Sequence, residues 1–293
     1  MLDIGIFAPF GDDHDRNVAF CQDTDVHHIV VSSSSSVAAD EASGAPDTEA
    51  LKQLAGKYTD SGIQLAALTP PRISQVAFTD LEVREKELTY MRGLLAAMGA
   101  AGIPYVHLYL NVDSIDEEKE DRDQLWAGLV EVYRAFMPAA EAAGVQISTH
   151  HYHRADRLLW NYQTMSTLIS EVGSGNNGVT YCQGKSQMAG DNLVDDILNY
   201  GNQIFMFHIR DVVTQVEGEP APEVAERLAR MGYLEVAFGT GEIDMVGSFK
   251  ALKQINYKGQ LYPEHFPSIA GDHAAGLAWT IGYMRAMDAA VEV

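Results

Sequence analysis

The sequence contains few basic residues, few cysteines and no long apolar segment. It has 20 Lys and Arg against 41 Asp and Glu, a formal net charge of −21. Binding along a nucleic-acid backbone needs a basic surface, so this composition argues against a nucleic-acid partner. No apolar run approaches the roughly 18 residues of a membrane-spanning helix, and no membrane partner is expected.

The two cysteines, Cys21 and Cys182, are typical of a reducing compartment, where disulfides are rare. The first ten residues have neither the basic segment nor the small-residue cleavage site of a signal peptide. These two features predict a cytoplasmic protein.

The chain alternates β-rich runs with amphipathic segments. Strands are expected at 3–9, 27–33, 63–70, 104–111, 145–150, 178–182, 203–211 and 260–265. Helices are expected at 13–22, 47–62, 80–102, 117–144, 157–173, 190–201, 241–259 and 271–293, and residues 220–232 are expected to form a short excursion from this pattern. Such alternation predicts a parallel sheet, and eight units predict an α/β fold in which residues 1–293 form one (β/α)₈ TIM barrel domain. The alternative is a doubly wound open sheet, but no G-x-G-x-x-G motif follows the first strand, where "FAPFGDD" stands.

Residues 32–47, "SSSSSVAADEASGAPD", form a segment of low complexity between a strand and its helix. Their position predicts either a mobile loop over one mouth of the barrel or a disordered insert without a role.

Four consecutive predicted strands end in residues that commonly bind metals: His150, Cys182, His208 and Glu264. Catalytic residues of (β/α)₈ barrels come from this end of the strands. Side chains alternate along a strand, and the apolar face of 145–150 should meet the helices. His150 should therefore point into the barrel, and His151 should face away or turn into the loop. The other three candidates share the parity of the smaller or more polar residues, least clearly in 203–211. The sequence predicts a divalent metal, for which Zn²⁺, Mn²⁺, Fe²⁺ and Co²⁺ are all suitable.

With these residues in place, the chain resembles the mannonate dehydratases within the xylose isomerase-like barrel superfamily. The resemblance is carried by 178–212, "GVTYCQGKSQMAGDNLVDDILNYGNQIFMFHIRDV", by "GEID" at 241–244 and by "YPEHFP" at 262–267. It implies Mn²⁺ as the metal bound by the four residues above, with Glu264 where the family usually has Asp. It also implies that Arg210, in "HIR", holds a substrate carboxylate or hydroxyl, and that His265 is an acid/base group.

The family places a catalytic Tyr ahead of its last helix, whereas here Leu277 or Ala278 aligns with it. A second proton-transfer group is therefore sought among His151, His153 and Tyr152, and His151 is our candidate catalytic residue. Two cations, Arg72 after "LTPP" and Lys185 after strand 178–182, are predicted to bind anionic substrate groups.

The resulting functional hypothesis is metal-dependent dehydration of a sugar acid, a mannonate-like aldonate, to a 2-keto-3-deoxy acid. The alternative is isomerisation or epimerisation of a keto sugar on the same metal. The 32- and 26-residue intervals between His150, Cys182 and His208 resemble the metal-ligand spacing of ketose 3-epimerases. Those enzymes use two facing carboxylates, whereas the strand ending at His150 offers no Glu. A third possibility is a barrel that binds a sugar or metal without turnover. The expected partner is a small sugar or sugar acid, and a homodimer is expected because related barrels often dimerise.

Overall fold

Eight parallel strands form a closed barrel in the computed structural model, which describes residues 1–33, 37–216, 218 and 220–292. The order around the barrel is β1-β12-β9-β8-β7-β5-β3-β2. These strands are β1 (Asp3–Phe7), β2 (His28–Ser32), β3 (Gln64–Thr69), β5 (Tyr105–Leu108), β7 (Gln146–His150), β8 (Asn177–Cys182), β9 (Ile204–Ile209) and β12 (Gln260–Pro263). The barrel is confirmed, and the doubly wound alternative is wrong because β1 pairs with β12 and closes the sheet.

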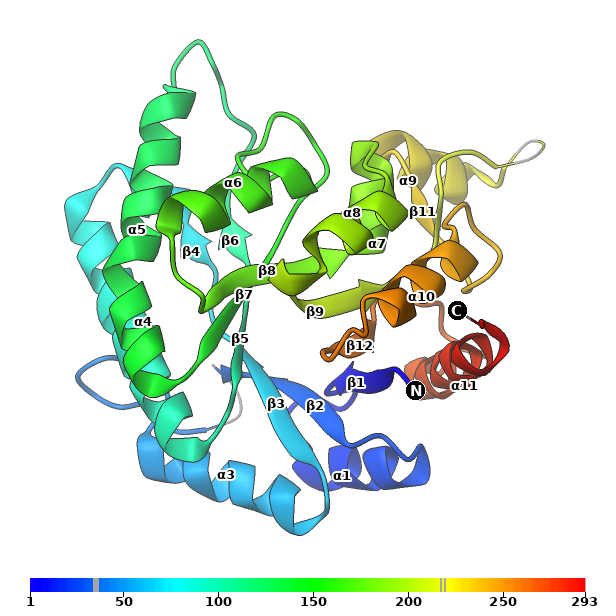
Figure 1. Ribbon diagram of the computed structural model, residues 1–293, viewed down its shortest axis with the longest axis horizontal. Coiled ribbons are helices and arrows are strands. Elements are labelled where there is room, and N and C mark those ends of the chain that lie inside the picture. The colour runs from blue at the N-terminus through cyan, green and yellow to red at the C-terminus, as the bar shows by residue number, and fades with distance from the viewer. Residues whose placement is uncertain (34–36, 217, 219, 293) are drawn as a thin grey trace.

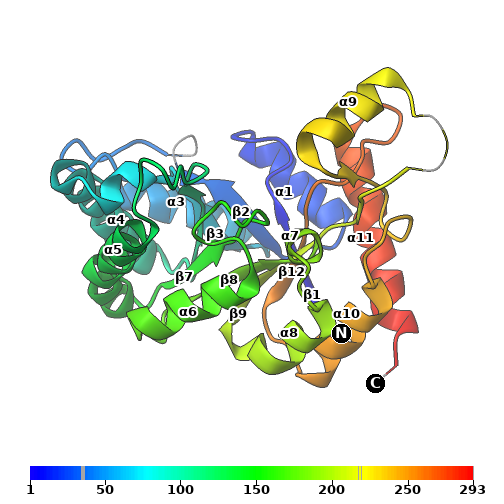
Figure 2. The same cartoon turned by 90° about the horizontal axis from the view of Figure 1, so that it is seen from above.

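Helices surround the strands on the outside (Figures 1 and 2). They are α1 (His14–Asp23), α3 (Thr48–Asp60), α4 (Leu81–Ala101), α5 (Arg122–Ala143), α6 (Tyr162–Val172), α7 (Gln183–Ala189), α8 (Leu193–Tyr200), α9 (Pro222–Met231), α10 (Met245–Gln254) and α11 (His273–Ala290). Two 3₁₀ turns, η1 (Gln75–Phe78) and η2 (Gly201–Gln203), complete the helical elements of the described residues. Short pairs outside the barrel join β4 (Ile73–Ser74) to β6 (Leu110–Asn111) and β10 (Val212–Val213) to β11 (Leu234–Glu235).

Aspartate is the N-cap residue of many of the helices, so part of the acidic composition stabilises helix ends. Its carboxylate accepts backbone N–H groups that the first turn leaves without partners. The aspartates that cap in this way are Asp13, Asp47, Asp80, Asp121, Asp244 and Asp272. Helices α4, α5 and α6 each end at a glycine with positive φ, in the left-handed conformation that other residues rarely adopt.

The alternation of side chains in β7 separates the barrel interior from the helix layer. Ser148 lies inside, where its hydroxyl is 2.7 Å from that of Thr180 on β8. Thr149 points outward, and its hydroxyl lies 2.7 Å from that of Tyr133 on α5. His150 has the parity of Ser148, and it therefore points into the barrel as the sequence predicted.

Several predicted element boundaries are wrong. The strand at 203–211 ends at Ile209 and that at 260–265 ends at Pro263, so Arg210, Glu264 and His265 lie just beyond their strands. The strand expected at 104–111 divides into β5 and β6, and the helix expected from 157 begins only at Tyr162. Helix α7 was not predicted, because its seven residues are too few to show an apolar period.

The segment 32–47 packs beside α4 in its described part. The Ser33 hydroxyl lies 2.8 Å from that of Tyr90 on α4, and Ala45 is buried. A Cβ added at Gly93 of α4 would lie 2.8 Å from the Ser43 hydroxyl, so this contact is close. Residues 34–36 lie outside the described residues, and the expectation of a mobile or disordered loop stays a prediction.

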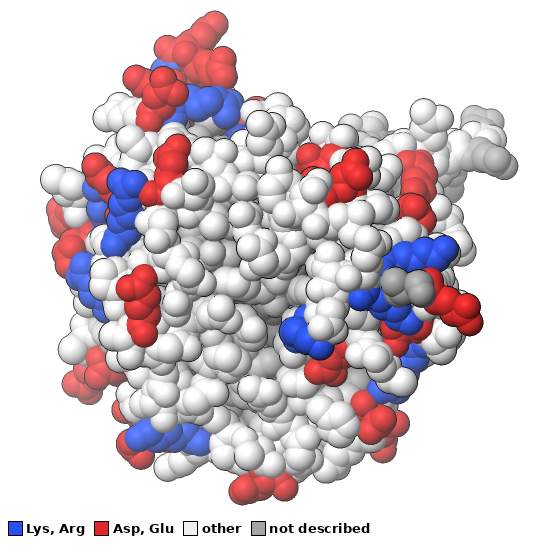
Figure 3. All heavy atoms as spheres, in the orientation of Figure 1, with Lys and Arg blue, Asp and Glu red and all other residues white. Residues whose placement is uncertain are grey.

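Among the described residues, no helix is both long and apolar enough to span a membrane. On the face shown in Figure 3, basic side chains lie among acidic ones around the rim, and the centre of that face is largely uncharged. This arrangement agrees with the acidic composition of the chain.

Candidate metal centre

A cavity of about 480 Å³ lies at the C-terminal ends of the barrel strands. Its walls combine aromatic and polar side chains, as small-molecule sites usually do. The lining residues are Phe7, Thr69, Arg72, His107, Tyr109, His150, His151, Tyr152, Lys185, Pro263, Glu264, His265, Phe266 and His273.

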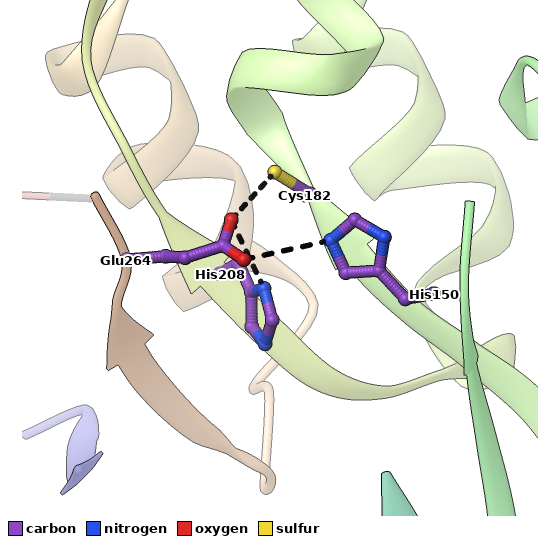
Figure 4. Close-up of side chains that lie close together, drawn as sticks. All are labelled: His150, Cys182, His208 and Glu264. Atoms are coloured by element: carbon purple, nitrogen blue, oxygen red, sulfur yellow. Dashed lines mark hydrogen bonds and ion pairs between the residues drawn. The ribbon is translucent and has the colours of Figure 1, made fainter. Parts of the chain in front are cut away.

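The four predicted metal ligands meet at this cavity. One ligand atom from each of His150, Cys182, His208 and Glu264 lies within 4.8 Å of the others. Figure 4 shows three of these side chains converging on the Glu264 carboxylate. The carboxylate lies 3.9 Å from His150 Nε2, 3.4 Å from His208 Nδ1 and 3.4 Å from Cys182 Sγ. Strands β7, β8 and β9 each supply one ligand, and the fourth follows β12.

Two of the candidate ligands, His150 and His208, have ring nitrogens that are free to bind a cation. Nε2 of His150 and both ring nitrogens of His208 are buried without a hydrogen-bond partner, which is rare for buried polar atoms. Burial lowers the pKa of His150 well below its usual range, so the imidazole is neutral, the form that binds metals. These residues therefore fit a divalent cation, for which imidazole, thiolate and carboxylate are ordinary ligands.

The two acidic ligands have pKa values that move in opposite directions. Burial alone would raise the pKa of Glu264, but the nearby imidazoles of His208, at 3.4 Å, and His265, at 3.5 Å, outweigh it, so the pKa lies well below its usual range. Burial, with a further contribution from the Glu264 charge, raises the pKa of Cys182 to about 12. Without a cation the cluster thus contains a carboxylate beside a neutral thiol.

Three residues of "HIRD" at the end of β9 have different partners. His208 joins the ligand cluster, whereas Arg210 is fully buried and is absent from the cavity lining. Arg210 Nη2 donates to Glu235 Oε1 at 2.8 Å, and its Nη1 lies 3.6 Å from Glu264 Oε2. Asp211 is also buried, and it accepts backbone N–H groups of the loop before α10.

His265 is the half-exposed imidazole at the cavity wall. Its Nε2 lies 3.5 Å from Glu264 Oε1, and its backbone has φ of +53°, a left-handed conformation that non-glycine residues rarely adopt. Such conformations are concentrated at functional sites, because the surrounding structure has to hold them. His265 therefore combines access to the cavity with a constrained position beside the ligand cluster.

His151 was expected to face away or to turn into the loop; it lies just beyond β7, at the start of the loop, but its side chain does not face away from the cavity. It is fully buried, its ring stacks against that of His150, and it lines the cavity. Its Nδ1 lies 2.8 Å from the Tyr152 carbonyl, and its Nε2 accepts the Cys182 N–H at 3.2 Å. The backbone carbonyl of Tyr152 and the backbone N–H of Cys182 thus contact the two ring nitrogens, and burial lowers the pKa of His151 to about 4.

The predicted cations and the remaining proton-transfer candidates surround the cavity. Arg72 is exposed, and its guanidinium lies 5.3 Å from the centre of the Tyr109 ring. Lys185 Nζ lies 3.3 Å from His153 Nδ1 and 3.4 Å from the Tyr233 hydroxyl. The Tyr152 hydroxyl donates to the Leu110 carbonyl, and it is therefore occupied by a backbone contact.

Sequence reasoning missed His107, within β5, and Tyr109, which directly follows that strand. His107 is fully buried at the floor of the cavity, with Nδ1 3.0 Å from the Thr69 hydroxyl and Nε2 without a partner. The Tyr109 hydroxyl donates to Glu264 Oε1 at 3.2 Å. The signal was present, because His107 and Tyr109 alternate with the aliphatic residues Val106, Leu108 and Leu110.

The comparisons with known proteins agree with the barrel fold. The sequence profile of the family described as Xylose isomerase-like TIM barrel matches residues 21–287. The chain belongs to this family. The predicted resemblance to mannonate dehydratases is also confirmed: that of Streptococcus pneumoniae (strain 70585) is 28% identical over 178 residues, 57% of this chain and 44% of that protein. The chain thus spans less than half the length of that curated relative.

Solved structures show the same fold at low sequence identity. A mannonate dehydratase from Streptococcus suis serotype 2 has a TM-score of 0.73 at 19% identity, covering 98% of this chain and 94% of the other. A D-psicose 3-epimerase from Clostridium cellulolyticum H10, solved with D-tagatose, has a TM-score of 0.74 at 16% identity, covering 98% and 99%. These likenesses extend over nearly the whole barrel.

Proposed function

We propose that this protein is a divalent-metal-dependent dehydratase that converts a mannonate-like sugar acid to a 2-keto-3-deoxy acid. The observation that carries the proposal is the convergence of His150, Cys182, His208 and Glu264 within 4.8 Å at the cavity. The partial similarity to mannonate dehydratases supports the substrate class. Mn²⁺ is the proposed metal, with Zn²⁺, Co²⁺ and Fe²⁺ as alternatives.

The reaction removes the C2 proton and the C3 hydroxyl, which leaves as water after it receives a proton. The enol that remains tautomerises to the 2-keto-3-deoxy acid. A bound divalent cation would supply electrophilic stabilisation of the negative charge that develops on the substrate oxygens. The protein's own groups then have to bind the acid, orient it and move two protons.

His265 is the proposed acid/base group, because its half-exposed ring borders the cavity and lies 3.5 Å from Glu264. Arg72 and Lys185 line the same cavity and would attract the substrate carboxylate. The buried Nε2 of His107, which lacks a partner, is suited to hydrogen-bond a substrate hydroxyl.

Two of the predicted site residues receive revised roles in this proposal. Arg210 does not line the cavity, so we propose that it interacts with the Glu264 carboxylate and does not contact the substrate. His151, whose two nitrogens contact the backbone, is proposed to position His150 and Cys182 instead of transferring protons. The expected homodimer and the cytoplasmic location stay predictions.

The second candidate is a keto-sugar isomerase or epimerase, which would use the same cation and the same acidified C–H bond. The extent of the structural likeness to a D-psicose 3-epimerase is compatible with it. The position of His150 at the end of β7 counts against it, because a pair of facing carboxylates would need an acid there.

The test is incubation with Mn²⁺ and a panel of aldonates and ketoses, with the products identified by NMR. We expect a 2-keto-3-deoxy acid from at least one aldonate and no reaction with His208→Ala. An isomerised ketose would favour the second candidate, and metal binding without turnover across the panel would contradict both. His28→Ala, a change at the opposite end of the barrel strands, is the control variant.

A further inference from the structure

Glu235 lies outside the barrel, on β11, yet its carboxylate faces the candidate site. It is mostly buried, with 11% of its side chain exposed. Oε1 accepts from Arg210 Nη2 at 2.8 Å, and Oε2 accepts from the exposed Arg227. The same Oε1 lies 3.8 Å from Nδ1 of His265. One carboxylate therefore connects the surface helix α9 to two residues beside the ligand cluster.

The residues around Arg210 leave space for its side chain. A Cβ at Gly184 would lie 2.8 Å from Arg210 Cδ, so glycine at that position makes room for the arginine. The guanidinium carbon lies 5.0 Å from the centre of the Tyr233 ring. Nε and Nη1 have no hydrogen-bond partner, and the next carboxylate within reach is Glu264, 3.6 Å from Nη1.

A buried guanidinium needs a carboxylate partner, because burying an uncompensated charge is costly. Arg210 has two such carboxylates, and it makes its hydrogen bond with Glu235. If Glu235 were removed, the remaining carboxylate would be that of Glu264, and planar guanidinium groups bind carboxylates strongly in two-pronged geometry. Arg210 would then compete with a cation for the Glu264 oxygens.

We propose that Glu235 is a positioning residue that holds Arg210 back from Glu264, so that the Glu264 carboxylate stays free to bind the metal. The same carboxylate faces Nδ1 of His265 and helps to hold that ring against the cavity wall. The inference rests on the proposed function only in requiring that the four-residue cluster binds a divalent cation.

The test measures Mn²⁺ binding by titration calorimetry, without any substrate. We expect Glu235→Ala to bind Mn²⁺ about 10- to 100-fold more weakly than the wild type, the usual effect of removing a partner of a metal ligand. Arg227→Ala, which removes only the outer contact of the same carboxylate, should bind within about twofold of the wild type. In the double variant Glu235→Ala/Arg210→Met the competing cation is gone, and most of the affinity should return.

Thermal unfolding monitored by circular dichroism establishes that each variant is folded, and Glu235→Gln serves if Glu235→Ala is not. The amide keeps the volume and one acceptor for Arg210 but removes the charge, so a smaller loss of affinity is expected. Wild-type affinity in Glu235→Ala, or no recovery in the double variant, would overturn the inference alone. A wild type that binds none of Mn²⁺, Zn²⁺, Co²⁺ and Fe²⁺ would overturn the proposed function and this inference with it.

Discussion

The two halves of the barrel mouth differ in chemistry although their strands have the same architecture. Strands β7, β8, β9 and β12 are neighbours in the barrel, and at their ends stand the four ligand-type residues. The facing strands β1, β3 and β5 contribute Phe7, Thr69 and His107 to the cavity, none of which carries a charge at neutral pH. We name these two sets the ligand half and the facing half.

The difference shows how one fold separates charge stabilisation from substrate placement. In the ligand half, one carboxylate collects contacts from imidazole, thiol and guanidinium groups. In the facing half, His107 is neutral because burial lowers its pKa well below the usual range. Its Nδ1 forms a hydrogen bond with the Thr69 hydroxyl. Changes in the ligand half should therefore abolish metal binding, whereas changes in the facing half should alter the handling of substrate.

The largest effect is expected for Cys182→Ala and His208→Ala in the ligand half. Their metal content, measured by mass spectrometry after Mn²⁺ loading, should fall to background. Activity should fall about a thousandfold or more, because an electrophilic metal contributes several kcal/mol and each tenfold is 1.36 kcal/mol.

The control for Cys182→Ala is Cys21→Ala, since Cys21 is the chain's other cysteine and is buried in α1. Cys21→Ala should keep its metal and lose only modest stability. Equal metal content in the two variants would break the distinction between the halves.

A large effect on stability is expected for Asp211→Ala, also in the ligand half. The carboxylate accepts the N–H groups of Gly239 at 2.8 Å and Gly241 at 2.9 Å, and that of Ile243 at 3.3 Å. The buried Ile243 N–H left without a partner costs about 1–3 kcal/mol, and the two less buried glycine donors cost less because water can reach them, so urea unfolding should show a loss of about 2 kcal/mol or more. Asp211→Asn keeps one acceptor and should lose less; equal losses in both variants would contradict this explanation.

A moderate effect is expected for His107→Phe in the facing half. The ring volume is kept, but the hydrogen bond proposed for a substrate hydroxyl is lost, so kcat/KM should fall about tenfold. Metal content should match that of the wild type. Loss of the metal in this variant would show that the floor of the cavity belongs to the metal centre, and the comparison of the halves would need to be redrawn.

The smallest effect is expected for Thr69→Val, which removes the hydroxyl 3.0 Å from His107 Nδ1. The imidazole then keeps its packing, but the hydrogen bond that fixes its tautomer is lost. We expect kcat/KM to fall by about two- to fivefold, which corresponds to no more than the net free energy of one typical hydrogen bond. Steady-state kinetics of Thr69→Val, His107→Phe and the double variant would measure the coupling. Strict additivity would mean that Thr69 does not act through His107.

The barrel and the ligand cluster could be predicted from sequence because both follow from local patterns. Clean alternation in 145–150 fixed the inward direction of His150, and the strands that follow it place their ends at the same face. The same alternation applies to β5, but His107 lies within that strand and not at its end, where the catalytic residues of such barrels are expected.

Other features depend on contacts that no local pattern encodes. The partnership of Arg210 with Glu235 joins residues 25 apart across β10, α9 and β11, and alternation along β9 gave no sign of it. The buried position of His151 follows from its contacts with the Tyr152 carbonyl and the Cys182 N–H, which the sequence around 151 does not reveal.

The most direct measurement is a crystal structure of the Mn²⁺-soaked protein with an anomalous difference map. The account predicts one strong peak within bonding distance of His150, Cys182, His208 and Glu264. A map without a peak there, or with the ion held elsewhere on the chain, would contradict it.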